Sequence, residues 1–380
     1  MGRLRRFVIV CLLLTGYLDW ADAQSLIDTL DGHPDLSEMM NSAYGVLPVA
    51  QPITEPALGI GVAGGLLYMH TKSSDMARAP GTPPDLSMVG GMYTANGSWA
   101  GALYHQNSLR EDRIRVKGVV AYASINLTYY AEDDQDLAGA SSDSSDGQNF
   151  NIEGLGFSPR AELRLFGTPF FLGLEYAFFA NEVVFEDYDP VSDNLSVETR
   201  LAGLGATLRF NTLDNAFTPN RGLRAVGGYK HFDTFLGGTE TYGLLIANGV
   251  GYLDPFGWLV LGLRLDGQWT FDEPPFYALP YVKLRGVPAL RYQGKQVIVI
   301  ETEERVNVSR RWSIVLFGGY GRPGLTTSRG NDYHEDVFAG GGGFRYLLAR
   351  LTGLYAGVDV ARGPQEWAFY ITIGSAWSGF

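Results

Sequence analysis

The sequence predicts an all-β protein, a transmembrane antiparallel β-barrel of about fourteen strands, with twelve or sixteen strands left open. Three observations lead to this prediction. In the closing segment, Gln365–Trp377, apolar residues recur at alternate positions, the period-2 pattern of a strand with one apolar face. Aromatic residues stand at both ends of that segment, with Trp367 and Phe369 at one end and Trp377 at the other, as in the two aromatic girdles of a membrane-spanning strand. Finally, 46% of the residues are hydrophobic although no run of about 18 apolar residues offers a membrane-spanning helix.

The composition supports a curved, aromatic-rich sheet and excludes one class of partner. The chain has 380 residues, with 49 Gly, 21 Tyr and 21 Phe. Its formal net charge is −12 and its pI is about 4.9, so no nucleic-acid partner is expected, because that would need a basic stripe.

The first residues have the pattern of a secretory signal, Met1–Ala23, with a basic start, an apolar segment and the small-residue site Ala21-Asp22-Ala23. The single cysteine, Cys11, lies within it, so the mature chain is expected to have no disulfide, no thiol chemistry and no cysteine-based metal site. Residues 24–56 are predicted to form a short periplasmic tether, and residues 57–380 the outer-membrane barrel. The sequence therefore predicts export to the bacterial outer membrane, with outer-membrane lipid as a partner.

Fourteen strand-like segments follow the tether, joined by connections that alternate between tight and long. The segments are Ala57–Met69, Leu86–Gln106, Asp112–Ala131, Asn149–Phe166, Phe170–Val184, Ser196–Asn211, Leu223–Thr234, Thr239–Leu253, Phe256–Phe271, Lys295–Asn307, Arg311–Gly321, Asp336–Leu348, Gly353–Arg362 and Gln365–Trp377. Asn96-Gly97, a favoured hairpin turn, is interpreted as a kink within one strand, because splitting that strand disturbs the alternation of tight turns and long loops. On this count Thr71–Asp85 belongs to the long loops, and the barrel closes at a weak seam between Ala57–Met69 and Gln365–Trp377.

Charged residues alternate with the apolar ones and are expected to face the barrel interior. They include Arg264, Asp266, Glu301, Glu303, Arg305, Arg345, Asp359 and Arg209. Because both signs are present, two interpretations remain open. The charges either pair only to keep a polar interior satisfied, or grip a loop that folds into the lumen.

Three stretches resemble the outer-membrane assembly and secretion superfamily, which includes BamA, TamA and bacterial surface antigens. The first is the run 211–222, with Asp214, Asn215, Pro219 and Gly222, which is similar to a periplasmic turn of that family. The second is Leu284-Arg285-Gly286-Val287 in the longest loop, similar to its Arg-Gly motif. The third is the closing series Glu303, Arg305, Arg345, Asp359 and the terminal Phe380.

The resemblance implies roles for these residues. Arg285 would fold into the lumen as a latch held by inner-wall acids, with Glu303 and Asp359 as candidates, because a buried arginine needs a carboxylate to offset its desolvation. Phe380 would belong to the signal read by the barrel-assembly machinery during biogenesis. The implied function is assistance in protein or lipid insertion or transport at the outer membrane. The alternative is a passive pore or structural surface antigen without a client.

The residues before the barrel are too few for the soluble POTRA repeats of that superfamily, so the resemblance implies a short member without them. Whether a periplasmic partner protein joins it is left open by the sequence. No enzyme motif and no cofactor site is recognised. The nearest cluster to a lipid hydrolase site is Asn107-Ser108 with His105, and it is set aside.

Overall fold

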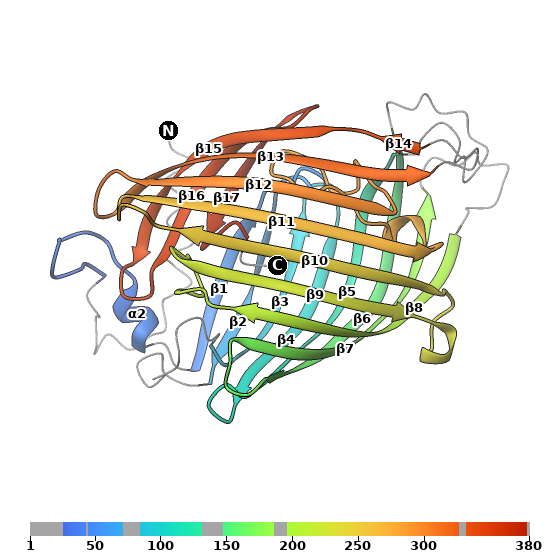
Figure 1. Cartoon of the computed structure of the whole chain (residues 1–380), viewed down its shortest axis with the longest axis horizontal. Helices are drawn as coiled ribbons and strands as arrows, with labels where there is room; N and C mark the ends of the chain where they lie inside the picture. Colours follow the sequence, from blue (N-terminus) through green and yellow to red (C-terminus); the bar gives the residue numbers. More distant parts are fainter. Residues whose placement is uncertain are drawn as a thin grey trace.

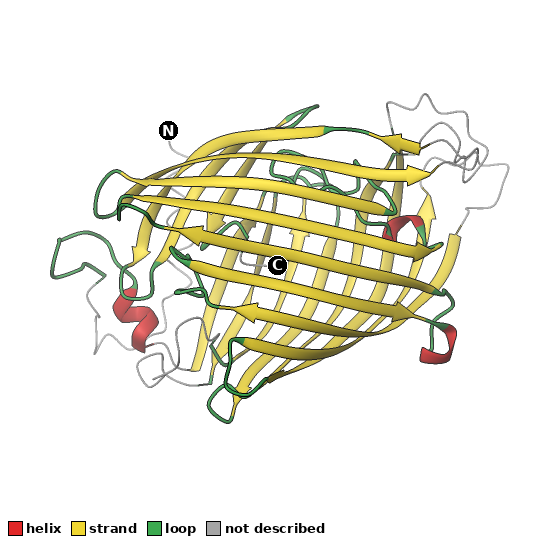
Figure 2. Ribbon diagram, in the orientation of Figure 1, coloured by secondary structure: helices red, strands yellow, loops and turns green. Residues whose placement is uncertain are grey.

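The computed structural model describes residues 26–42, 45–70, 84–130, 147–185, 196–326 and 332–377. Within these ranges, sixteen strands form one antiparallel, nearly closed barrel, shown in Figures 1 and 2. The first half consists of β1 Gly45–Ile53, β2 Gly61–Met69, β3 Leu86–Thr94, β4 Trp99–Leu109, β5 Ile114–Tyr129, β6 Gln148–Arg164, β7 Phe170–Phe185 and β8 Ser196–Asn211. The second half consists of β9 Gly222–Phe232, β10 Tyr242–Leu253, β11 Leu259–Asp272, β12 Gln296–Asn307, β13 Trp312–Thr326, β15 Val337–Ala349, β16 Leu354–Arg362 and β17 Trp367–Ile373. The three-residue β14, Asp332–His334, pairs only with the far end of β13, and the helical pieces are α2 Ser37–Ser42, η2 Thr234–Leu236 and η3 Phe276–Ala278.

The all-β barrel is confirmed, and its sixteen strands are one of the counts left open by the sequence, two more than the preferred fourteen. The Asn96-Gly97 pair is a hairpin turn between β3 and β4, with Gly97 at φ +86, and not a kink. The predicted tether contains β1, whose residues all pair with β2. Both corrections shift the order of the connections. The connection between β2 and β3, which was expected among the long loops, therefore starts and ends at the end of the barrel that holds the short turns.

Two ends of the barrel can therefore be distinguished. The turn end holds the short connections 110–113, 165–169 and 254–258, and β1 begins there. The loop end holds the connection 273–295 between β11 and β12. No helix within the described residues is long and apolar enough to span a membrane.

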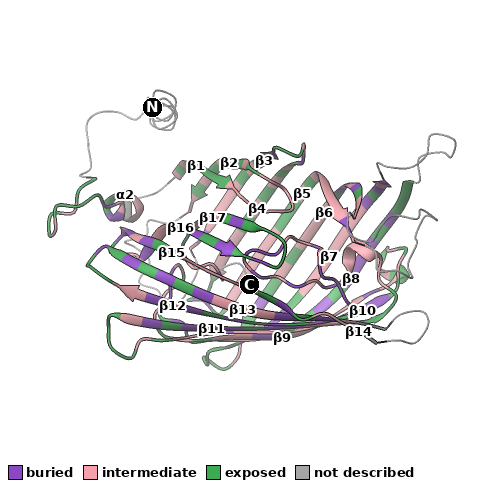
Figure 3. Ribbon diagram, turned by 90° about the horizontal axis from the view of Figure 1, so that it is seen from above, coloured by how far each residue is buried: buried purple, intermediate pink, exposed green. Residues whose placement is uncertain are grey.

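The barrel wall has apolar side chains outside and charged side chains inside. On β11, Leu263 and Leu265 are 45% and 48% exposed, whereas Arg264 and Asp266 are 4% and 6% exposed. Figure 3 shows the same alternation of exposed and buried positions along other strands. A soluble protein hides its aliphatic side chains, so this inverted pattern is that of a wall that contacts lipid.

The barrel closes where β1 comes next to β17, and this junction lacks the regular pairing of the rest of the wall. Register pairs join every neighbouring strand from β1 to β17, but none joins β1 to β17 among the described residues. The β1–β2 register is unbroken through Pro48 and Pro52, which have no N–H. Both prolines therefore occupy non-hydrogen-bonded pairs with β2, and their nitrogens point toward β17. Two donors are thus missing at this edge, and the predicted seam is displaced by one strand, from β2 to β1.

The chain end turns into the lumen instead of continuing as a strand. β17 stops at Ile373, and Gly374 has a φ of +80. Trp377 is 2% exposed and packs with Leu213 and Val250. Its predicted place in an outer aromatic girdle is therefore wrong. Phe380 and the predicted signal Met1–Ala23 lie outside the described residues.

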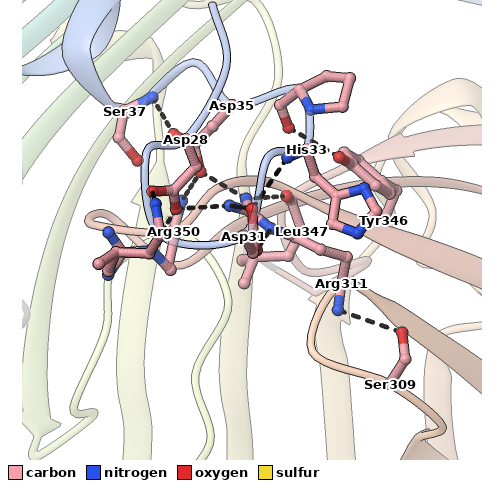
Figure 4. A network of polar contacts seen from close by, with 12 residues as sticks. Asp28, Asp31, His33, Asp35, Ser37, Ser309, Arg311, Tyr346, Leu347 and Arg350 are labelled. Carbon is pink, nitrogen blue, oxygen red and sulfur yellow. Dashed lines mark hydrogen bonds and ion pairs between the residues drawn. The ribbon is translucent and has the colours of Figure 1, made fainter.

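The N-terminal segment, residues 26–42, is fastened to the turn end by three aspartates around one arginine (Figure 4). Arg311 Nη2 lies 2.6 Å from Asp28 Oδ2, its Nε lies 2.6 Å from Asp31 Oδ2, and its Nη1 lies 2.5 Å from Asp35 Oδ2. Arg350 also binds Asp28, at 2.6 Å, and the backbone N–H of Leu36 donates to the carbonyl of Leu348. Because Arg311 and Arg350 precede β13 and β16, the segment ties the turns of the closing strands together.

Candidate functional site

Residues 273–295, here called the plug loop, leave the loop end and fold into the lumen. Val282, Leu284 and Val287 pack against Val297 and Val299 on the inner face of β12, and all five are at most 5% exposed. Val287 therefore contributes to the core of the loop. The loop is held by an apolar cluster as well as by charges.

Two glycines on the inner face of β13 make room for the plug loop. A Cβ on Gly319 would overlap Leu284, and one on Gly321 would overlap Val282. Gly318 points outward from the same strand, and a Cβ there would meet nothing within 4 Å. The apolar residues of the loop thus fit hollows that only glycine can leave in the wall.

We expect Gly321→Ala to displace the plug loop, because the added methyl group would occupy the position of Val282 and overpacking costs about 1–3 kcal/mol. The unfolding temperature of the folded barrel should fall, and the solvent accessibility of a label at residue 282 should rise. Gly318→Ala adds the same methyl group to the lipid face and should change neither. Equal effects of the two substitutions would contradict the assigned position of the loop.

Arg285 at the tip of the plug loop is held by three carboxylates. Its Nε lies 2.8 Å from Glu301 Oε1, and its Nη1 lies 2.8 Å from Glu303 Oε2 and 3.2 Å from Asp359 Oδ2. The guanidinium also lies 3.6 Å from the ring centroid of Phe317, a cation–π contact. The structure thus brings Arg285, Glu303 and Asp359 together and adds Glu301, a further carboxylate on the inner face of β12.

The acids around Arg285 have further basic or donor partners. Glu301 Oε2 accepts from Arg264 Nη1 at 2.9 Å and from the indole Nε1 of Trp377 at 2.8 Å. Asp359 binds Arg345 through both oxygens, at 2.5 and 2.9 Å. Charged side chains that would each be costly to bury alone form a continuous network here.

Glycines also accommodate the Arg345–Asp359 pair. A Cβ on Gly343 would overlap the Asp359 carboxylate, and a Cβ on Gly357 would lie 2.8 Å from Arg345 Cδ. Within the run Gly340–Gly343, the absence of a side chain therefore permits close packing inside a strand.

Gly286 fixes the loop tip against the last hairpin. It has a φ of +92, and a Cβ there would lie 2.8 Å from the nitrogen of Gly363, in the β16–β17 turn. Its N–H donates to the hydroxyl of Tyr370 at 2.8 Å. The Arg-Gly pair thus uses the charge of one residue and the absence of a side chain in the next.

Arg305 does not contact Arg285. It donates instead to Asn220 Oδ1 and lies over the ring of Tyr355 at 4.9 Å. Asn220 belongs to the predicted turn motif, so Arg305 connects that turn to the inner wall.

The turn motif itself is a set of side-chain to backbone bonds at the turn end. Asp214 Oδ1 accepts from the N–H groups of Asn220 and Arg221, and Asn215 Oδ1 accepts from those of Phe217 and Thr218. Pro219 is buried, and Gly222, at φ +104, has no room for a Cβ beside Thr212. These hydrogen bonds satisfy backbone N–H groups of the turn between β8 and β9 and fix its conformation.

The plug loop also contacts the β1–β2 turn. Glu55 accepts hydrogen bonds from the backbone N–H groups of Ala289 and Ala57, and burial raises the pKa of its carboxyl to about 7. Because the pKa of Glu55 in the folded barrel is raised from 4.5 to about 7, the protonated carboxyl stabilises the folded state. This contribution is complete below pH 4.5 and is lost as the pH rises through about 7.

We expect the unfolding temperature of the wild-type barrel to fall as the pH is raised from 5 to 9, and Glu55→Gln to remove much of this slope, because the amide cannot ionise. Thermal unfolding followed by circular dichroism checks this. Glu273→Gln, at a carboxylate that is 84% exposed, should leave the slope unchanged. A slope retained by Glu55→Gln would assign it to other groups.

The far side of the plug loop closes the lumen toward the loop end. Phe276 packs on Tyr129, Phe150 and Phe185 of β5, β6 and β7, with ring centroids 4.7 to 5.6 Å apart. Arg291 lies over Tyr130 at 3.8 Å. The loop thus reaches from the β12–β13 wall across to strands that are distant in sequence.

Sequence reasoning placed Glu301 and Arg264 inside the barrel but did not predict that they join the Arg285 network, and it placed Trp377 outside. The period-2 pattern gives the face of a residue but not its neighbour across the strands. The glycine at 374 was the available signal for Trp377. His105 Nδ1 forms a hydrogen bond with Ser87 Oγ at 2.8 Å. Among the described residues, no hydrogen bond joins His105 to Ser108 of the hydrolase-like cluster.

Comparisons with solved structures find the same architecture in known barrels. BamA from Haemophilus ducreyi lacking POTRA domains 1–3 matches with a TM-score of 0.58 at 12% identity, over 88% of this chain and 70% of that one. CdiB from Acinetobacter baumannii matches with a TM-score of 0.55 at 11% identity, over 86% and 59%. CdiB from Escherichia coli matches with a TM-score of 0.57 at 10% identity, over 87% and 62%.

No protein-family model and no curated protein matches the chain. At such low identity the structural matches show the fold: this chain has the barrel architecture of BamA and CdiB. They confirm, at the level of the fold, the resemblance drawn from the sequence motifs.

Proposed function

We propose that this protein is a bacterial outer-membrane barrel that assists the insertion or transport of protein or lipid, with a lumen closed by a latched loop and a wall that opens at the β1–β17 seam. The single observation that carries the proposal is Arg285, gripped by Glu301, Glu303 and Asp359 inside the lumen. Arg285 is the charged anchor of the plug loop, and loss of its ion pairs would leave the apolar cluster and the aromatic contacts of Phe276 as the remaining contacts that hold the loop inside the lumen.

The seam supplies the second element of the proposal. The edge of β1 that faces β17 carries backbone groups without a regular strand partner among the described residues, and two of its nitrogens belong to prolines and have no hydrogen to donate. β17 itself has only seven residues. An edge with unmade backbone bonds is costly in hydrocarbon, so such a seam opens more readily than any other junction and can receive an incoming strand or lipid.

A cysteine scan tests the seam. Pairs placed on β1 and β17 should crosslink under oxidation in the outer membrane, and the crosslinked protein should fail to support growth or membrane integrity in a strain that depends on it. The predicted mature chain has no cysteine, so each introduced pair would be the only two thiols in the protein. Crosslinking Ala63→Cys to Met92→Cys, partners in the β2–β3 ladder, is the control and should be harmless. Full function with the β1–β17 crosslink in place would rule out lateral opening.

The alternative is a passive pore or structural antigen without a client. It predicts that the β1–β17 crosslink is tolerated and that steady conductance is seen in the intact protein. The N-terminal segment faces the periplasm in both cases, and crosslinking from residues 26–42 would identify a periplasmic partner protein.

A further inference from the structure

A second region of the inner wall, on β5 to β9, carries more positive than negative charge. The register pairs Asp266 with Asn248, Asn248 with Val226 and Val226 with Arg209, which places Arg209 on the same inner face as Asp266. Seven basic and three acidic side chains share this face, all but Lys230 in the part of the wall nearer the turn end, and they give a surplus of four positive charges. They are Arg115, Lys117, Arg160, Arg164, Arg209, Arg224 and Lys230, with Asp112, Glu162 and Glu175, and are here called the cationic wall.

Each acid of the cationic wall is already shared between two cations. Glu162 Oε1 lies 3.2 Å from Arg160 and 3.0 Å from Arg209. Glu175 lies 2.5 Å from Lys230 and 3.7 Å from Arg160. Asp112 binds Arg115 at 2.6 Å and also Arg164. No carboxylate of this group remains to balance a further cation.

Lys117 is that further cation. It stands directly across the β5–β6 ladder from Arg160, and within the described ranges no carboxylate forms an ion pair with it. Like charges opposite one another on a sheet repel. Arg209 and Arg160 meet at Glu162 beside them, so an anion at this point would relieve the repulsion.

The position of the cationic wall also favours a ligand. Its strands lead to the turns 110–113, 165–169 and 212–221, at the same end as the N-terminal segment, whereas the aromatic contacts of the plug loop lie at the opposite end of β5 to β7. A positive surface in a low-dielectric barrel concentrates anions even though the chain as a whole carries −12. By contrast, the network around Arg285 has acids enough to bind its own basic groups.

We propose that the cationic wall binds a phosphate-bearing ligand that enters from the turn end, with Lys117, Arg160 and Arg209 as its contacts. Two guanidinium forks and one ammonium match the several oxygens and the double charge of a phosphate group better than a single halide ion. The phosphate comes either from a lipid headgroup or from a soluble phosphate compound. This inference does not depend on the latch or on the seam.

Titration calorimetry of the full-length protein in zwitterionic detergent, with inorganic pyrophosphate as the probe, tests the proposal. Lys117→Gln should weaken binding about tenfold or more, because it removes one charge-assisted bond to the anion. Lys117→Arg should retain binding. Lys295→Gln removes the same charge at the loop end, where Lys295 pairs with Glu273, and should leave binding unchanged.

Heat stability separates this effect from a loss of structure. Since Lys117 forms no ion pair with a carboxylate in the described part of the chain and faces Arg160, Lys117→Gln should unfold at the same temperature as the wild type or higher. Competition by phosphatidylglycerol in mixed micelles, without competition by phosphatidylcholine, would identify a lipid headgroup as the source. Pyrophosphate binding without such competition would identify a soluble phosphate. Equal pyrophosphate binding by Lys117→Gln and Lys295→Gln, or no pyrophosphate binding by the wild type, would overturn the proposal.

Discussion

Arg285→Ala should open the lumen and destabilise the latched state by about 3–5 kcal/mol. Removing the guanidinium leaves Glu301, Glu303 and Asp359 close together with a deficit of positive charge, and breaking a buried ion pair on one side costs this much. In planar bilayers the wild-type barrel should be mostly closed, and the variant should show large, frequent openings. Its unfolding temperature on semi-native gels should fall in parallel.

Two further substitutions define the cause. Arg285→Lys keeps the charge but lacks the planar fork that reaches several carboxylates, so it should give an intermediate result. Arg322→Ala removes an arginine that is 48% exposed and 4.0 Å from Asp336, and it should behave as the wild type. Should Arg285→Ala match Arg322→Ala in conductance and heat stability, the arginine would be only one of many lumen charges.

Arg311→Ala should release the N-terminal segment from the turn end. The arginine is 2% exposed and is the common partner of Asp28, Asp31 and Asp35, which would repel one another without it. We expect a cost on the order of 2 kcal/mol, less than for a fully enclosed pair because solvent screens the edge of the barrel. Amide hydrogen exchange of residues 26–42 should accelerate, while exchange in the strands stays slow. Arg310→Ala, at the exposed neighbouring position, is the control and should leave exchange unchanged.

The same segment should detach in acid. Burial opposes ionisation of Asp35, but hydrogen bonds from Ser37 and Arg311 outweigh it and lower the pKa of this carboxyl from 3.8 to about 2. A lowered pKa means that the contribution is complete above about pH 4 and is lost as the pH falls through 2. Limited digestion with pepsin between pH 4 and pH 1.5 should show cleavage near Leu30 appearing only at the low end. Cleavage already at pH 4 would contradict a stable clamp.

The faces of the barrel strands could be read from the sequence because alternation is a local property. Arg264, Glu301 and Asp359 alternate with leucine, isoleucine and valine, and all three are buried inside. The β1 strand escaped detection because Pro48 and Pro52 normally argue against a strand, and only an edge with no regular partner tolerates them. The Asn96-Gly97 hairpin was visible as a turn, but without β1 the order of long and short connections contradicted it.

The partners of the site residues could not be read in the same way. Which acid meets Arg285 depends on how far the plug loop descends, and Gly319 and Gly321 set that depth from a different strand. The three aspartates that hold Arg311 lie more than 270 positions from it, so no local pattern connects them. The surplus charge of the cationic wall likewise emerges only when five strands are placed side by side.

A disulfide between the plug loop and the wall tests the central claim most directly, namely that the loop lies inside the lumen against β13. The Cβ of Val282 lies 3.3 Å from the position that a Cβ on Gly321 would take, close to the separation in a disulfide. The pair Val282→Cys and Gly321→Cys should therefore crosslink on mild oxidation in intact outer membranes, whereas Val282→Cys with Gly318→Cys, on the outer face of the same strand, should not. Failure of the first pair to crosslink, or crosslinking of both pairs alike, would contradict a plugged lumen.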